Sequence, residues 1–499
     1  MISVLLITAA LAMGQTPGML PDMAPASGMS QAADTASAAP LVLTLEDALK
    51  IALSENVAVK VADREVERTK YAQKGTYAAL FPQIDGSAAY QRTIKKQVMY
   101  MDGDSFDFGS MIASTLTGYL APLYAQHPGI TPPAPASSSE SSSSGNDGIE
   151  VGRWNTFSAG ISAAVPLVNL QLWESLRLSA DEVELAVEKA RSSRLEMVTQ
   201  VKQAFFGVLM AKEAATVYGD VYDNALENCA QTQRRYDAQK ASELDLARAK
   251  TTLANAVPNV YDSQNAVTLS LWQLKAVMGV DLDLEIDVAG ELEDYSVQMF
   301  YDLHEHDGAT LEDNSTMRQL ALQAQQLAES IRAQQYASLP SLSLGFSYSL
   351  NAMTNDFNFS EFNWSPYSYV GISLSIPIFS GGKRLNAVRQ AKVQAVELEL
   401  QRVNTERQLQ IAIRQYLNTM ETAMKSYQAA GDARETASKA YDIASKSYEV
   451  GRSTLTELND AQLALTQARL SVSQAIFNFV VAKAGLEQTL GYEPEVLRQ

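Results

Sequence analysis

The sequence predicts an α+β membrane protein in which a small β-sheet continues into unusually long helices, with the whole pattern written twice. Three observations support this class: strands with one apolar and one small or polar face, helical runs that lack proline, and motifs that recur in the same order. The clearest repeat is "GISAAVPLVN" at 160–169 against "GISLSIPIFSGG" at 371–382, where each copy passes a proline and opens onto a helical run.

The strands are predicted at about 82–100, 154–168, 340–352 and 364–379 from period-2 alternation. Their length matches a tilted crossing of the hydrocarbon layer, and a small polar face suits a water-filled lumen. Four strands are too few to close a barrel without an open edge, so several copies must share one. The alternation is clearest after Pro340, where one face carries Leu342, Leu344, Phe346, Tyr348 and Leu350 and the other Ser343, Gly345, Ser347 and Ser349.

The helices are predicted from long runs without breakers. Residues 169–235 contain no proline, and 385–427 contain neither proline nor glycine. At 1.5 Å per residue, the first run would reach about 100 Å if it is continuous. Such rods pack against neighbouring helices as in coiled coils, because a compact domain cannot bury them on all sides.

Local signals set the ends of these helices. Residues 44–47 ("TLED") form a capping box at the first helix, and Pro82 and Pro340 close the first helical stretch of each copy. At the hairpin tips, Gly451 ends one helix and Ser453 or Thr454 caps the next, and Gln239 stands where the second copy has Gly451. Pro258 is expected to kink or break the first return helix.

The chain therefore divides into two repeats. The stretch 55–90 aligns with 313–348 without a gap, and the stretch from Tyr236 aligns with that from Tyr448. We expect a signal peptide at 1–12, a disordered lead at 13–40, a first repeat at 41–281, an equatorial connector at 282–312 and a second repeat at 313–492. The Ser- and Pro-rich segment 101–150 is expected to be an extracellular low-complexity loop.

Composition excludes several functional classes. The net charge of −18 argues against a nucleic-acid partner, and the single cysteine, Cys229, allows no intrachain disulfide or thiolate metal cluster. His304 and His306 are interpreted as an exposed polar turn, with His127 the only other histidine. No nucleotide loop, nucleophile elbow or HExxH motif is present, so we predict neither catalytic site nor cofactor nor metal.

Taken in order, these motifs resemble those of the TolC-like outer-membrane efflux proteins over about residues 43–492. The motifs are "LTLEDALKIALSEN", "ALFPQIDGSAAY" and "ASLPSLSLGFSY", the opening pair, and "YEVGRSTLTELNDAQLAL". The resemblance implies a homotrimer whose four strands per chain make one 12-stranded barrel in the outer membrane, continued by a helical coiled-coil barrel through the periplasm. It also implies a periplasmic adaptor (membrane fusion) protein and an inner-membrane pump or ABC transporter as partners, in tripartite efflux or type I secretion of small molecules or proteins.

The resemblance further implies a periplasmic gate at the hairpin tips. By position, Glu457 and Asp460 are the constricting acidic pair, and Tyr448 with Asp245 is the latch between helices. The sequence departs from the family at its gating arginine, where Ser453 stands and Arg452 lies one residue earlier. Three copies of the acidic pair would place about six carboxylates in one opening, which would favour cations and raise carboxylate pKa values by like-charge repulsion.

Two other classes are weighed against this passive, non-enzymatic duct. A non-transporting coiled-coil envelope spacer or adhesin would display the Ser-rich loop, but it would not need small polar faces on the strands. A soluble metal-binding protein would use His304 and His306 and would fractionate without detergent.

Overall fold

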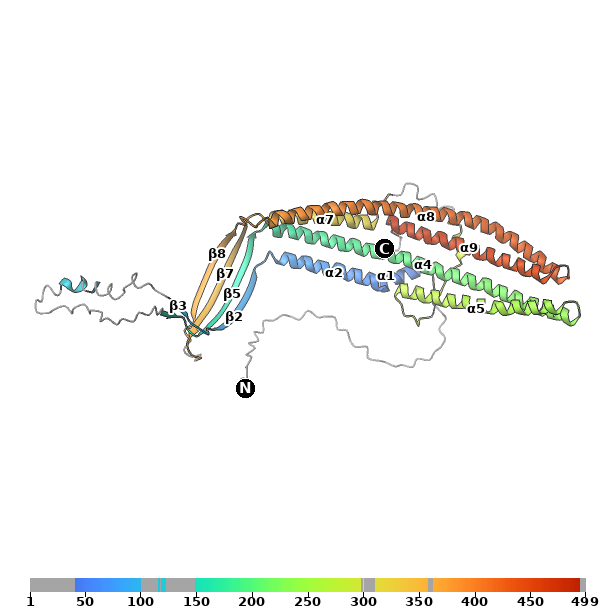
Figure 1. The fold of residues 1–499 in the computed structure, drawn as a ribbon, viewed down its shortest axis with the longest axis horizontal. Helices are drawn as coiled ribbons and strands as arrows, with labels where there is room; N and C mark the ends of the chain where they lie inside the picture. Colours follow the sequence, from blue (N-terminus) through green and yellow to red (C-terminus); the bar gives the residue numbers. More distant parts are fainter. Residues whose placement is uncertain are drawn as a thin grey trace.

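The chain is a long rod with a β-sheet at one end and helices extending from it (Figure 1). The computed structural model describes residues 41–99, 115–116, 118–122, 149–297, 299, 310–357 and 362–493. The predicted signal peptide, the lead, the three histidines and most of the 101–150 loop lie outside these residues. The helices are α1 (Leu45–Glu55), α2 (Val57–Ala78), α4 (Leu170–Asp237), α5 (Glu243–Met278), the 3₁₀ turn η1 (Leu292–Tyr295), α7 (Ser315–Tyr336), α8 (Lys383–Glu449) and α9 (Leu455–Leu490). The strands are β1 (Leu41–Leu43), β2 (Gln83–Arg92), β3 (Gln97–Met99), β4 (Ile149–Val151), β5 (Asn155–Val168), β6 (Ile286–Val288), β7 (Ser341–Thr354) and β8 (Ser365–Ser375).

The main sheet is antiparallel, in the order β2-β5-β7-β8. Its register aligns the predicted faces across all four strands, because directly paired residues point to the same side. One row is apolar, and the next is small or polar except for one tyrosine. The apolar row is Ile84, Ala163, Phe346 and Val370, and the next is Asp85, Ser162, Ser347 and Tyr369. The strand interpretation is thus confirmed, and strands β2 and β8 are the two edges of the sheet.

The apolar face of this sheet is exposed in the single chain. On the edge strand β8, Val370, Ile372 and Leu374 are between 60% and 69% exposed. On the opposite face, the hydroxyls of Ser343 and Ser373 lie 3.0 Å apart across neighbouring strands. An exposed apolar band backed by a polar face is what a barrel wall between lipid and water requires.

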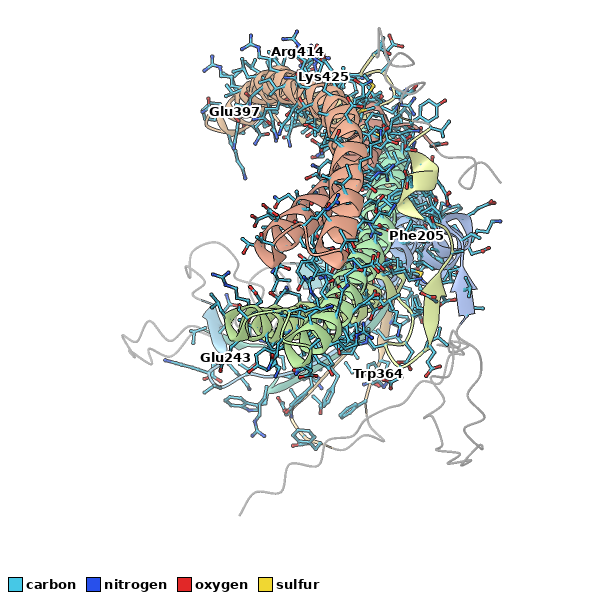
Figure 2. All side chains as sticks on the ribbon, turned by 90° about the vertical axis from the view of Figure 1, so that its right-hand side faces the viewer. Phe205, Glu243, Trp364, Glu397, Arg414 and Lys425 are labelled. Carbon is cyan, nitrogen blue, oxygen red and sulfur yellow. The ribbon has the colours of Figure 1, made fainter. Side chains whose placement is uncertain are left out.

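The helices form one curved layer. Near the sheet, the neighbouring contacts run α2–α4–α7–α8, and farther along they run α5–α4–α9–α8. Viewed down the rod, this layer is an arc and not a closed bundle (Figure 2). Its main core lies mid-rod, where α1, α4, α5 and α9 meet, and it includes Phe205, Leu274, Met278 and Phe479. Within the described ranges, no helix has a stretch apolar and long enough to span a bilayer.

Two joints stack shorter helices end to end. Asn56 caps α2 by accepting from the Ala58 N–H (2.8 Å), while its amide donates to Val277 O at the end of α5 (2.6 Å). Asn314 caps α7 by accepting from the Met317 N–H (2.9 Å) and donates to Thr489 O at the end of α9 (2.6 Å). Each joint therefore turns two helix ends into one pseudo-continuous rod.

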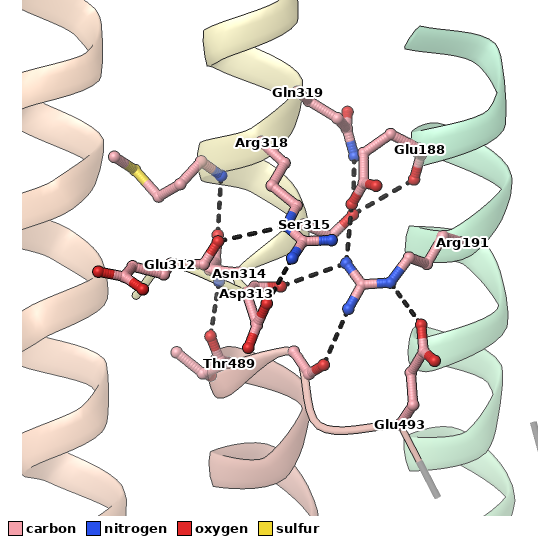
Figure 3. A network of polar contacts seen from close by, with 12 residues as sticks. Glu188, Arg191, Glu312, Asp313, Asn314, Ser315, Arg318, Gln319, Thr489 and Glu493 are labelled. Atoms are coloured by element: carbon pink, nitrogen blue, oxygen red, sulfur yellow. Dashed lines mark hydrogen bonds and ion pairs between the residues drawn. The ribbon is translucent and has the colours of Figure 1, made fainter. Parts of the chain in front are cut away.

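An arginine from α4 clamps the second joint (Figure 3). Arg191 donates to Gly491 O (2.9 Å), to Asp313 O (3.2 Å) and to the Glu493 carboxylate (2.6 Å). The Glu188 carboxylate, one turn earlier on α4, accepts a further bond (2.9 Å). The Arg191 guanidinium thus holds the carbonyl of Gly491, just past the end of α9, beside that of Asp313, just before α7.

Several predicted boundaries need correction. The strand predicted at about 82–100 is two strands, β2 and the short β3, which pairs with β4. Strand β8 ends at Ser375, short of the predicted 379, just before Pro377. Pro258 was expected to kink or break the return helix; the break is wrong, because α5 runs through it, and the kink stays a prediction. Pro258 and Ala254, whose carbonyl loses its helical donor, are both exposed, so water can supply that bond.

The long helices are confirmed. Helix α4 is a single helix of 68 residues and α8 one of 67, and the capping box predicted at residues 44–47 is formed by Thr44 and Asp47. The division into repeats stays a prediction, although both halves follow the order helix, strand, strand, long helix, return helix. In the predicted connector, β6 pairs in parallel with β1, the first of the described elements.

Candidate functional site

The candidate site is the pair of hairpin tips farthest from the sheet, where α4 turns into α5 and α8 turns into α9. Both turns use the same backbone device. Gln239 and Gly451 adopt positive φ (58° and 78°), and the residue after each donates to the helix carbonyl five positions back (2.7 and 2.8 Å). This is a Schellman motif, which normally favours glycine, so Gln239 is the strained member of the pair.

Tyr448 joins the two tips. Its side chain is only 5% exposed and packs with Leu455, Leu458 and Ala249. Its hydroxyl lies 2.5 Å from Thr232 Oγ1 on α4. Because the Thr232 hydroxyl donates its proton to Asn228 O (2.8 Å), the Tyr448 hydroxyl is the donor between the two helices.

Arg235 completes this contact from the same side of α4. It donates to Tyr448 O (2.7 Å), and its guanidinium carbon lies 5.0 Å from the centre of the Tyr448 ring. A Cβ added to Gly451 would lie 3.0 Å from the Arg235 guanidinium, so glycine also leaves room for it. The sequence analysis did not predict Thr232 and Arg235 as partners of Tyr448. Their position in the last turns of α4 before the tip was the one feature that could have indicated this role.

Asp245 does not pair with Tyr448 in this chain, contrary to the predicted latch. Its carboxylate accepts from the Ser242 hydroxyl (2.7 Å) and the Ser242 N–H (3.3 Å), which makes it the third residue of a capping box on α5. Tyr448 is bonded to Thr232 and Arg235 of α4 instead, and its role as a latch stays a prediction.

Glu457 occupies the equivalent capping position on α9. Its carboxylate accepts from the Ser453 hydroxyl (2.6 Å) and the Thr454 N–H (2.9 Å). These hydrogen bonds lower the pKa of Glu457 below its ordinary value, and the bond from Ser453 has the largest effect. In the single chain the pKa of Glu457 is therefore lowered, which is opposite to the rise predicted for a ring of carboxylates, and Glu457 stays charged. Its carboxylate is turned toward the N-terminal end of its own helix.

Asp460 and Arg452 are exposed near the same tip. Asp460, one turn beyond Glu457, lines an open groove between α8 and α9 whose other walls include Ala430, Ala433 and Leu463. Arg452 lies in the turn itself, where its backbone N–H donates to Ser447 O (2.8 Å). Ser453, which stands in the expected arginine position, instead holds the Glu457 carboxylate.

Comparison with known families decides where this architecture belongs. The profile of the family described as "Outer membrane efflux protein" matches residues 126–280 and 308–492, which is more than half of the chain. The chain belongs to the outer membrane efflux protein family. We accordingly assign it to the bacterial outer membrane, with its helical part in the periplasm.

Two curated relatives are distant in sequence. The outer membrane protein TolC of Vibrio cholerae is 20% identical over 287 residues, covering 54% of this chain and 63% of TolC. The alkaline protease secretion protein AprF of Pseudomonas aeruginosa is 22% identical over 245 residues, covering 48% of this chain and 49% of AprF. The chain thus matches less than two thirds of the length of either relative.

Solved structures of outer membrane channels share the fold. The Campylobacter jejuni CmeC channel superposes with a TM-score of 0.64 at 17% identity, covering 90% of this chain and 85% of CmeC. CusC superposes with a TM-score of 0.65 at 14% identity (91% and 93%), and the Neisseria gonorrhoeae MtrE channel with 0.61 at 16% (90% and 88%). The efflux-family fold is therefore helix-dominated α+β, in agreement with the predicted class.

Proposed function

We propose that three copies of this internally duplicated chain form a passive exit duct, with one shared 12-stranded barrel in the outer membrane and a helical tunnel through the periplasm. The observation that carries the proposal is the open four-stranded sheet. Its edges β2 and β8 are unpaired within the described chain, and its exposed apolar face is continuous from edge to edge. A sheet in lipid must leave no backbone edge unpaired, so the edges must meet those of other copies.

The helical layer supports the same assembly. Its arc, seen in Figure 2, is a curved wall and not a packed bundle, so several copies are needed to enclose a tunnel. The relatives named for protease secretion and for outer membrane channels fit an export role. We further propose that a periplasmic adaptor protein and an inner-membrane pump or ABC transporter dock on the helical end and supply the energy, in tripartite efflux or type I secretion.

The test is to extract the full chain in detergent, count its subunits by native mass spectrometry and record conductance in planar bilayers. A trimer that conducts supports the duct. A protein that is monomeric and soluble without detergent, or a trimer with no conductance, contradicts it, and the latter would favour the envelope spacer.

A further inference from the structure

The main sheet carries almost no charge, and its one cation lies at the end farthest from the helices. Strands β2, β5, β7 and β8 contain only two charged residues, Asp85 and Arg92, in a chain whose net charge is −18. Arg92 is the last residue of β2 and is exposed. Since β2 follows α2 and runs away from it toward β3, Arg92 lies at the far end of the sheet (Figure 1).

Arg92 belongs to the apolar face of the sheet. Alternate residues of a strand share a face, so Arg92 is on the side of Tyr90 and Ile84 and opposite to Asp85. On the same face, the Tyr90 ring lies 4.8 Å from the Phe157 ring of β5, centre to centre. The strand from Ile84 to Arg92 is about 26 Å long, which is comparable with the apolar band of a barrel wall. Arg92 is thus at the outer boundary of the band that lipid chains would cover.

Two lysines and an exposed isoleucine follow Arg92 in the segment between β2 and β3. Lys95 is exposed, and the side chain of Ile94 is 95% exposed. Lys96 is half-buried, and its ammonium nitrogen lies 4.7 Å from the centre of the Trp154 ring. Cations beside an aromatic ring and an exposed apolar side chain are typical of the boundary between lipid chains and headgroups.

Backbone hydrogen bonds hold this segment in place. The Thr93 N–H donates to Trp154 O (2.8 Å), which continues the pairing of β2 with β5 by one residue. The Trp154 N–H in turn donates to the side-chain oxygen of Asn355 (3.3 Å), just beyond β7. Beyond the segment, β3 pairs with β4. Residues 93–96 are therefore fixed between two paired stretches, and their cations stay close to the end of β2.

The cations at this end outnumber the acids. Within the part of the chain that the structure describes, the Arg92 and Lys95 side chains have neither a hydrogen-bond partner nor an ion-pair partner. Arg153 is a further cation of this end, and it donates to Met353 O (3.0 Å). The described acids here are Glu150 on β4 and Asp356 beyond β7, both exposed. Arg92, Lys95 and Lys96, which we call the basic cluster, are thus available to an anionic ligand.

We propose that the basic cluster binds the phosphates of a phosphorylated glycolipid in the outer leaflet of the outer membrane, with Ile94 and Trp154 against its acyl chains. The ligand is anionic because guanidinium and ammonium groups bind phosphate, and it is a lipid because Arg92 continues the apolar face. The helices lie in the periplasm, so the opposite end of the sheet is at the outer leaflet, whose lipids carry their phosphates on sugars. The inference rests on the proposed barrel, which places this face in lipid.

Binding of lipid A, a phosphorylated glycolipid, tests this site. The full protein in detergent is titrated with lipid A, and native mass spectrometry gives the apparent Kd from the bound fraction. Arg92→Gln with Lys95→Gln should raise this Kd by about 25-fold, because each basic side chain near an anionic lipid surface contributes about fivefold. Both side chains are exposed, so the variant should keep its fold.

The matched control is Arg389→Gln with Lys392→Gln, which removes the same two kinds of charge from exposed positions near the start of α8. The control should leave the Kd for lipid A unchanged, because those positions lie at the other end of the sheet. Three further ligands define the chemistry in the wild type. Dephosphorylated lipid A and phosphatidylglycerol should bind more weakly than lipid A, and inorganic phosphate should not displace it.

The outcomes separate this inference from the proposed function. A conducting trimer whose lipid A affinity is the same in the Arg92 and Lys95 variant, or falls equally in the control, overturns the site and leaves the duct standing. Equal binding of phosphatidylglycerol or of dephosphorylated lipid A overturns the glycolipid assignment. A protein that is monomeric and soluble without detergent overturns both inferences. A loss of affinity confined to the basic cluster and to phosphorylated lipid A supports the site.

Discussion

At the scale of single residues, the Tyr448 hydroxyl is the most sharply defined contact between the two hairpins. Tyr448→Phe removes one donated hydrogen bond and leaves Thr232 still bonded to Asn228 O. A net loss of about 1 kcal/mol, or about fivefold in the opening equilibrium of the tips, is expected for such a bond. Hydrogen exchange of the amides around residues 232–250 measures that opening.

The control for this change is Tyr441→Phe, which alters a tyrosine packed against the same cluster. It should leave exchange at residues 232–250 near the wild-type rate. Equal acceleration by both variants would show that ring packing, and not the Tyr448 hydroxyl, holds the tips together.

A second residue-scale prediction concerns pH. Glu329 on α7 is 7% exposed, and its pKa is raised by a hydrogen bond with the Glu174 carboxyl, by burial and by the nearby charges of Glu174 and Asp181. Arg332 opposes the rise, since it pairs with both Glu329 (2.7 Å) and Glu174 (3.3 Å). A hydrogen bond between two carboxyls requires one of them to keep its proton.

The raised pKa of Glu329 determines whether the protein becomes more or less stable as pH rises. The stability that the protonated Glu329 contributes is fully present below its unfolded pKa and is lost as pH rises through the higher folded pKa. Glu329→Gln mimics the protonated form, so its melting temperature should exceed that of the wild type at neutral pH and approach it in acid. A difference between the two proteins that does not change with pH would contradict this assignment.

At the scale of helices and strands, the two stacked joints depend on glycine. Gly279 and Gly491 both have positive φ (76° and 74°). A Cβ on Gly279 would lie 2.8 Å from Glu55 O, and one on Gly491 would overlap Asp313 O. Gly279→Ala and Gly491→Ala should each destabilise the fold by about 1–3 kcal/mol, with Gly491→Ala the worse, because backbone cannot move aside as a flexible side chain can.

The matched control is Gly431→Ala within α8, where no atom lies within 4 Å of the added Cβ. It should stabilise the protein by about 0.5–1 kcal/mol, because alanine is the better helix former. Thermal unfolding monitored by circular dichroism compares the three variants. If Gly431→Ala and Gly491→Ala shifted the melting temperature in the same direction, the steric account of the joint would fail.

Local features of these elements were predictable from the sequence, because they depend on neighbouring residues. The capping box at Thr44, the glycine turn at 451 and the alternation of 342–350 each lie within a few positions. The partners of Tyr448 and the Arg191 clamp were not predictable, because those contacts join residues more than 100 positions apart and only packing brings them together. The continuity of α5 through Pro258 was not predictable, because it depends on the solvent exposure of that part of the helix, which the local sequence does not reveal.

At the scale of the whole molecule, the charge at the tunnel end is the testable property of the proposed trimer. In the proposed trimer, three copies would bring Glu457 and Asp460 around one axis. The interaction energy of two opposite unit charges 4 Å apart in water is about 1 kcal/mol, which raises the local cation concentration by a factor of about 5. Asp460→Asn should lower the cation-to-anion permeability ratio by about this factor, and block by multivalent cations should weaken with it.

Glu457→Gln provides a second measurement, because glutamine can keep the capping box while removing the charge. The lowered pKa of Glu457 means that its carboxylate stays charged as pH falls below the ordinary carboxyl range. The stability that this charged cap contributes is fully present above the unfolded pKa and is lost as pH falls through the lower folded pKa. Cation preference in Asp460→Asn should therefore survive mild acid, whereas the double variant should lose it at every pH. Glu397→Gln is the control, because this exposed acid, labelled in Figure 2, lies near the start of α8 and the tip lies at its other end. Unchanged selectivity of the double variant in single-channel recordings would show that these acids do not line the conducting path.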